Sequence, residues 1–145
     1  MRNIIPNTIK MTAYLDSNIF IFAALDSSEK GKKARDILKK THEEGIVTFT
    51  SSLTIDEVVW SILKQTKNRA LAIEQGARIL ELKSIGIVNI DEKIIRGALN
   101  LMKIHLSLKP RDAIHLSAAP FIGASVMISD DSDFDEVNDI KRKSL

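Results

Sequence analysis

The sequence contains no cysteine, and this absence excludes several kinds of site at once. Disulfide bridges cannot stabilise the fold, and zinc sites built on thiolates are ruled out. No apolar stretch reaches the roughly 18 residues that a membrane-spanning helix needs. The N-terminus also lacks the apolar core of a signal peptide. We therefore expect a soluble, cytoplasmic protein that has no contact with a membrane.

Nucleotide-binding loops are missing as well. The chain has neither a Gly-x-Gly-x-x-Gly pattern nor a Gly-Lys-Ser/Thr pattern, so nothing supports a nucleotide cofactor. Histidine is scarce, with three residues in the chain. Carboxylate oxygens therefore remain as the main candidates for binding a metal ion, and such ligands favour hard cations over zinc.

Length and composition are those of an ordinary globular protein. The 145 residues are 44% hydrophobic and 28% charged, which suits one domain with one core. We expect this domain to cover residues 11–145. Residues 1–10 look polar and irregular, and two interpretations stay open for them: a flexible N-terminal arm, or a segment upstream of a natural start at Met11.

The distribution of charge says more than the net charge of +2. Residues 130–139 contain six acidic residues and no basic one, whereas basic residues crowd positions 30–40. A locally acidic spot on a slightly basic protein is compatible with a metal site beside a surface that binds phosphate groups.

Short apolar stretches alternate with helical patterns along the chain. The strand-like stretches are residues 12–15, 46–49, 85–90 and 125–129, with a short fifth strand near 137–140. The helical stretches are 29–44 ending at Gly45, 53–66, 69–84, 91–106 with Asp91 as N-cap, and one that Pro110 opens. This alternation predicts an α/β layer sandwich with a mainly parallel sheet.

Acidic residues follow two of the predicted strands. Asp16 ends the first strand, within Asp16-Ser17-Asn18, and Asp130, Asp131 and Asp133 end the fourth. Ligands of open parallel sheets bind beyond the carboxyl ends of the strands, so these acids converge if the two strands are neighbours. The alternatives are that Asp16 caps the next helix and that the later acids form a solvated turn.

Two further acids lie near the starts of predicted helices. Glu57 sits among apolar residues, and Asp112 lies in an Arg-Asp-Ala-Ile-His segment. Glu57 could instead form a capping box with Thr54, and Asp112 could be a first-turn acid favoured by the helix dipole. Carboxylates about 5 Å apart repel by about 3 kcal/mol per pair at an effective dielectric near 20, so a cluster of them calls for a cation.

At this point the motifs resemble a PIN domain, and in particular the VapC-type toxin ribonuclease of VapBC toxin–antitoxin systems. The resemblance extends from about residue 11 to residue 140. It rests on Asp-Ser-Asn after the first strand, a Glu in an apolar helix start, Arg-Asp-Ala-Ile-His, and Ser-x-Asp-x-Asp-Phe after the fourth strand. It implies a three-layer α/β/α sandwich around a sheet of four to five strands.

The resemblance also implies roles for individual residues. The catalytic, metal-binding acids would be Asp16, Glu57, Asp112 and Asp131. Asn18 and Ser129 would orient ligands or water, and Asp133 would support them. Whether Asp130, Asp131 or Asp133 is the fourth ligand stays open, because Asp130 takes a position that is often Asn or Arg in relatives.

The activity implied is hydrolysis of RNA phosphodiester bonds by water that Mg²⁺ or Mn²⁺ activates, with a 3′-hydroxyl left behind. The implied partners are an RNA substrate and a cognate antitoxin protein, and we expect a homodimer. A non-catalytic PIN-like module that binds RNA or protein is the alternative. A phosphatase of the haloacid-dehalogenase type is disfavoured, because it needs Asp where the chain has Asn18.

Other residues have two interpretations each. We expect His115 to pack or to form hydrogen bonds rather than to bind metal. The apolar stretch 19–25 and Trp60 are either buried or part of a surface for a partner. The basic residues at 30–40 and in the segment 141–143 are either solvated or in contact with phosphate groups.

Overall fold

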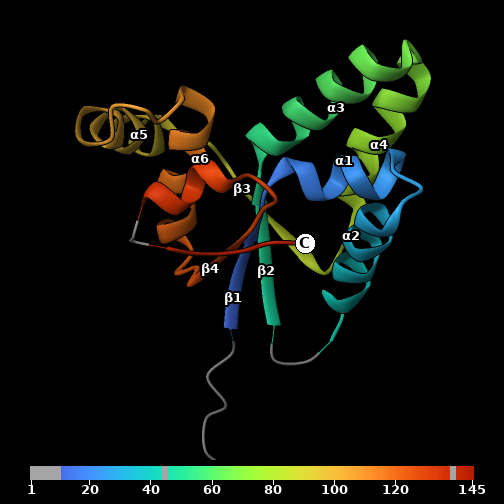
Figure 1. The fold of residues 1–145 in the computed structure, drawn as a ribbon, viewed down its shortest axis with the longest axis horizontal. Coiled ribbons are helices and arrows are strands. Elements are labelled where there is room, and N and C mark those ends of the chain that lie inside the picture. Colours follow the sequence, from blue (N-terminus) through green and yellow to red (C-terminus); the bar gives the residue numbers. More distant parts are fainter. Residues whose placement is uncertain (1–10, 44–45, 138–139) are drawn as a thin grey trace, which may run out of the picture.

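The structure, a computed structural model, describes residues 11–43, 46–137 and 140–145 (Figure 1). The strands are β1 (Met11–Leu15), β2 (Ile46–Ser51), β3 (Ile85–Val88), β4 (Val126–Ile128) and β5 (Lys141–Lys143). The helices are α1 (Ser17–Leu25), α2 (Glu29–Lys40), α3 (Ser52–Thr66), α4 (Arg69–Glu81), α5 (Glu92–Ile104), α6 (Pro110–Phe121) and the 3₁₀ helix η1 (Ser132–Glu136). The interpretations of residues 1–10, the helix end at Gly45 and the acidic residue Asp139 lie outside the described residues.

The strands form one parallel sheet in the order β3-β2-β1-β4-β5. Strand β1 lies in the centre, where Ala13 pairs with Thr48 of β2 on one side and with Val126 of β4 on the other. The chain thus moves from β1 to β2 in one direction and later returns to β4 on the opposite side of β1. The carboxyl ends of β1 and β4 are neighbours, so the acids that follow the two strands converge as predicted.

Helices cover both faces of the sheet (Figure 1). Tyr14 and Met127 point into a core that they share with α5 and α6. The next residue along β1, Leu15, points to the other face, where it packs in a core built from α1, α3 and α4. The predicted three-layer α/β/α sandwich is therefore confirmed. In the described part of the chain, no helix combines the length and apolar character that a membrane span requires.

Two predicted helix starts are confirmed by their local contacts. The side chain of Asp91 accepts a hydrogen bond of 3.0 Å from the backbone N–H of Ile94, so it caps α5. Pro110 is the first residue of α6, where its missing N–H costs no helical hydrogen bond. These two helices carry the layer that lies over Tyr14.

Helix α2 is shorter than predicted, because it ends at Lys40 rather than near residue 44. The hydroxyl of the buried Thr41 donates to the carbonyl of Leu38 at 2.7 Å and also contacts Ser84 Oγ at 2.8 Å. The side chain therefore anchors the end of α2 to the segment before β3.

The predicted fifth strand near residues 137–140 includes residues 138–139, which lie outside the described residues, and the observed strand begins directly after this stretch. Val137 and Ile140 are buried in the core beneath α6, and the strand forms afterwards, at Lys141–Lys143. Apolar residues were needed to fill the core, whereas an edge strand tolerates the lysines that discourage pairing with another chain.

Solvent exposure decides between burial and a partner surface for the apolar stretch 19–25 and for Trp60. Ile19 and Phe20 of α1 are buried, as the burial interpretation requires, but Ala24 is exposed. Trp60 on α3 is 55% exposed, so its burial is contradicted. The side chains of Ala24 and Trp60 are therefore accessible to a partner.

We expect the substitution Gly31→Ala to lower the stability of the protein. A Cβ atom at Gly31 would lie 1.8 Å from the carbonyl oxygen of Asp26, where α1 and α2 meet. Overpacking of this kind costs about 1–3 kcal/mol, although an alanine normally stabilises a helix relative to glycine. Urea unfolding measures the change, and Lys32→Ala, on the exposed side of the same helix, is the control. A midpoint for Gly31→Ala at or above that of the parent protein would contradict the close approach.

Candidate metal centre

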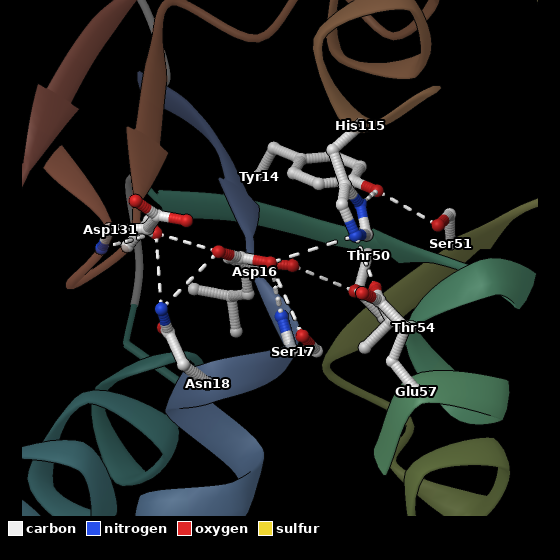
Figure 2. Close-up of polar contacts among 12 residues, drawn as sticks. Tyr14, Asp16, Ser17, Asn18, Thr50, Ser51, Thr54, Glu57, His115 and Asp131 are labelled. Carbon is white, nitrogen blue, oxygen red and sulfur yellow. Dashed lines mark hydrogen bonds and ion pairs between the residues drawn. The ribbon is translucent and has the colours of Figure 1, made fainter. Parts of the chain in front are cut away.

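Asp16 stands at the junction of β1 and α1 and is 6% exposed. Its Oδ1 accepts a hydrogen bond from the backbone N–H of Ser17 at 2.7 Å, so Asp16 caps α1. Its Oδ2 accepts from the hydroxyl of Ser129 at 2.6 Å and from the side-chain amide of Asn18 at 3.3 Å (Figure 2). The cap interpretation of Asp16 is therefore correct, and it leaves the carboxylate in a fixed orientation at the end of the central strand.

The hydroxyl of Ser129 joins the ends of β1 and β4. While it donates to Asp16, it accepts from the Asn18 amide at 3.2 Å and from the backbone N–H of Asp131 at 3.0 Å. One donor and two lone pairs are thus all used. Ser129 thereby sets the backbone position of Asp131 relative to the carboxylate of Asp16.

Glu57 comes from the second turn of α3, which begins at Ser52. The proposed capping box with Thr54 is wrong, because Thr54 is the third residue of the helix and its hydroxyl accepts from Thr50 Oγ1 at 2.7 Å. The carboxylate of Glu57 instead forms a hydrogen bond with Nε2 of His115. That nitrogen lies 3.6 Å from Oδ1 of Asp16, so the imidazole brings the two acids to the same place.

His115 is 1% exposed and lies between these acids and Tyr14, whose hydroxyl is 2.6 Å from Nδ1 (Figure 2). The hydrogen-bonding interpretation of His115 therefore fits the structure. Burial works to lower the pKa of His115, but the hydrogen bond to Glu57 and the charge of Asp16 outweigh it, so the pKa is raised. For the Tyr14 hydroxyl, whose charged form is an anion, burial instead raises the pKa.

Asp112 lies in the first turn of α6, as the helix-dipole interpretation expected. Burial raises the pKa of its carboxyl group to about 6, and the negative charges of Asp131 and Asp16 add to this effect. A carboxylate oxygen of Asp112 lies within 4.8 Å of oxygens of Asp131 and Asp133. The position of Asp112 is thus electrostatically unfavourable in the absence of a cation.

The three acids after β4 have different surroundings. Asp130 forms an ion pair of 2.6 Å with Lys30, and Asp133 lies 3.7 Å from the ammonium group of Lys109. Asp131 lines an open depression together with Glu57 of α3 and Asp112 of α6. Asp133, by contrast, approaches Asp112 but does not line the depression.

The donor atoms form two neighbouring groups among the described residues. Asp16, Glu57 and His115 make one group, and Asp112, Asp131 and Asp133 make the other, with the atoms of each within 4.8 Å of one another. Five of these six donors are carboxylates, which suits a hard cation such as Mg²⁺ or Mn²⁺. The raised pKa of Asp112 points the same way: burial is its main cause, and a cation would relieve the repulsion by Asp131 and Asp16 that adds to it.

Some contacts of the site gave no signal in the sequence. Tyr14 lies in the middle of a buried strand and reads as a core residue, yet its hydroxyl donates to Ser51 Oγ at 2.8 Å and contacts His115. Arg142 of β5 donates to the carbonyl of Ser129 at 3.2 Å and to the carboxylate of Asp135 at 2.7 Å. The contact of Arg142 with Ser129 depends on the pairing of β4 with β5, which no local sequence pattern indicates.

The chain matches one known protein family over most of its length. The family model of the PIN domain matches residues 13–140. The chain therefore belongs to the PIN domain family. No curated protein matches it in a sequence search.

Solved structures with a similar fold include several toxins and toxin–antitoxin complexes. Mycobacterium tuberculosis VapC20, described as a Sarcin-Ricin loop cleaving toxin, is 12% identical with a TM-score of 0.73, over 87% of this chain and 95% of that one. VapBC2 from Rickettsia felis, bound to a promoter DNA fragment, is 16% identical with a TM-score of 0.66, over 92% and 98%. A toxin–antitoxin complex from Klebsiella pneumoniae is 23% identical with a TM-score of 0.60, over 88% and 94%.

We expect Asp112→Asn to stabilise the metal-free protein at pH 7.5. Because the folded pKa of Asp112 lies above the ordinary value of 3.8, this group favours folding most at low pH, and that contribution is lost as the pH rises through about 6. The gain should be about 1 kcal/mol, a figure discounted because the carboxylate is only half-buried.

Urea unfolding in the presence of a chelator, at pH 7.5 and at pH 4.5, measures this effect. The difference between Asp112→Asn and the parent protein should shrink at the lower pH. A variant that is less stable than the parent at pH 7.5 would show that the attraction of the Asp112 carboxylate to the N-terminus of α6 outweighs repulsion by the other acids.

Proposed function

We propose that this protein is a metal-dependent endoribonuclease, and that it acts as the toxin of a type II toxin–antitoxin pair. The observation that carries the proposal is the convergence of acids from β1, α3, α6 and the loop after β4 on one end of a PIN-domain sheet. A site of this composition suits phosphoryl chemistry, because its negative carboxylates attract a hydrated divalent cation, which can in turn bind the phosphate group.

In this proposal Asp16, Glu57, Asp112 and Asp131 hold Mg²⁺ or Mn²⁺, and Asp133 supports them. The bound ion would lower the pKa of a water molecule and offset the charge of the phosphate group. Ser129 and Asn18 keep the carboxylate of Asp16 oriented through their hydrogen bonds. The protein side chains thus supply oxygen ligands in fixed positions for the ion, beside which the scissile phosphate would bind.

The surroundings of the site also support a polyanionic substrate. Lys109 and Arg111 line the same depression as Glu57, Asp112 and Asp131. Their positive charges can attract the phosphates on either side of the cleaved bond, although contacts of this kind carry no preference for a base sequence. The structurally similar VapC20 is described as cleaving the Sarcin-Ricin loop, which favours RNA over DNA as the substrate class.

A cognate antitoxin is the proposed protein partner. Several structurally similar proteins are toxin–antitoxin complexes. The chain has an apolar depression of suitable character, bounded by two arginines. Its lining residues are Phe20, Ala23, Ala24, Arg35, Leu38, Val58, Gln75, Arg78, Ile79 and Leu82. An amphipathic segment with acidic residues would complement this surface. A homodimer and a cytoplasmic location remain predictions of the same assignment.

The proposal is tested by incubating the purified protein with labelled structured RNA and Mn²⁺ or Mg²⁺. We expect cleavage that a chelator abolishes and that Asp16→Asn reduces by at least about a hundredfold, since it removes a charged ligand. Asn retains the acceptor for the Ser17 N–H, so circular dichroism should show an intact fold. Asp56→Asn, an exposed neighbour of Glu57, is the matched control and should cleave normally.

Cleavage by Asp16→Asn at the parent rate would remove Asp16 from the mechanism. Binding of RNA that needs no metal and leads to no cleavage would favour the alternative, a PIN-like module that only binds RNA or protein. Analysis of the product ends adds a further check, because metal-activated water should leave a 3′-hydroxyl.

The proposal predicts a small reading frame next to this gene, and its product, once found, is co-expressed with this chain to test the partner. Co-expression should yield a stable complex in which RNA cleavage is suppressed. Ala24→Arg, at the exposed end of α1, should weaken this complex by about tenfold or more while leaving the cleavage by free protein unchanged. Full suppression of Ala24→Arg by the same partner would place the contact elsewhere.

A further inference from the structure

His115 is the buried ionisable residue of the acidic site whose task the proposed function leaves open. It lies in the same group of possible ligands as Asp16 and Glu57. We propose that His115, held from behind by Tyr14, is a positioning residue that fixes the carboxylate of Glu57 for the metal ion and does not itself bind the ion. The inference rests on the metal site of the proposed function.

The positions of the hydrogen atoms argue against a role as ligand. A carboxylate only accepts hydrogen bonds, so Nε2 of His115 must carry the hydrogen in its contact with Glu57. The other nitrogen, Nδ1, faces the hydroxyl of Tyr14 at 2.6 Å, on the side away from the acids. Because the Tyr14 hydroxyl donates its one hydrogen to Ser51 Oγ, it accepts from Nδ1, so the imidazole presents no lone pair to the acidic site.

The imidazole is fixed by the rigid part of the fold. Tyr14 is fully buried in the central strand, and its hydroxyl reaches Ser51 Oγ at the end of β2. The rings of Tyr14 and His115 pack edge to face, with centroids 5.6 Å apart. Helix α6 carries the imidazole, and Tyr14, itself hydrogen-bonded to Ser51 at the end of β2, holds the ring from behind (Figure 2).

Glu57 depends on this support more than Asp16 does. Asp16 is held by the start of α1 and by the side chains of Ser129 and Asn18. Glu57 has a longer side chain, 17% exposed, and within the described residues its side-chain hydrogen bond is the one with His115. Without that bond, the carboxylate would have to be ordered by the metal ion itself, at a cost to affinity.

Binding of Mn²⁺ to the protein, followed by electron paramagnetic resonance without RNA, tests the inference. We expect His115→Leu to raise the dissociation constant by about tenfold to a hundredfold, the range found when groups behind metal ligands are removed. His115→Gln, which keeps an N–H donor, should recover part of this loss. Tyr14→Phe leaves the imidazole without its anchor and should raise the constant severalfold. His42→Gln, on the exposed surface, is the matched control and should bind as the parent does.

The spectra and the kinetics supply readouts that a purely structural role would not change. Electron spin echo modulation of bound Mn²⁺ should lack the coupling of a directly bound ¹⁴N nucleus. With RNA, His115→Leu should need more Mn²⁺ for half-maximal rate, while the rate at saturating Mn²⁺ stays within about tenfold of the parent.

Two results would overturn the inference. One is a direct ¹⁴N coupling, which makes His115 a ligand. The other is an unchanged Mn²⁺ affinity in His115→Leu, or in Tyr14→Phe if the leucine variant fails to fold. Parent protein that binds Mn²⁺ but cleaves no RNA would contradict the ribonuclease proposal and leave the positioning role supported by its own measurements. Parent protein that binds no Mn²⁺ would overturn both.

Discussion

The pairing of β1 with β4 is the contact on which the acidic site depends. These strands are separated by more than a hundred residues in sequence, yet their register places Leu15 opposite Ile128. The residues that directly follow the two strands are therefore Asp16 and Ser129, whose side chains form a hydrogen bond of 2.6 Å. A shift of one residue in this register would turn the side chains of β4 to the opposite face of the sheet and break that contact.

Around this junction the fold tolerates an unfavourable concentration of negative charge. The raised pKa of Asp112 reflects burial and the proximity of Asp131 and Asp16. Elsewhere in the acidic stretch the protein offsets charge with bases of its own, as in the pairs Lys30–Asp130 and Arg142–Asp135. Asp112 and Asp131, by contrast, have no ion pair with a basic side chain among the described residues, as expected of groups that bind a cation.

The sequence predicted the layers of the fold well, because apolar periodicity and caps such as Asp91 and Pro110 act locally. It also selected acids that the structure brings to one end of the sheet. It failed where long-range packing decides: Val137 and Ile140 were used in the core rather than in a strand. The contact of Tyr14 with His115 joins positions 101 residues apart, and no local pattern could have indicated it.

Helix α1 has two ends with different freedom to vary. Its first turn is tied to the capping carboxylate of Asp16 and to buried Ile19 and Phe20, so substitutions there would move an acid of the site. Its last turn, with Ala24 exposed beside an apolar depression, touches none of those acids. If the proposed function holds, divergence among paralogues would exchange the residues that a partner recognises, while the proposed chemistry at the opposite end of the same helix stays constant.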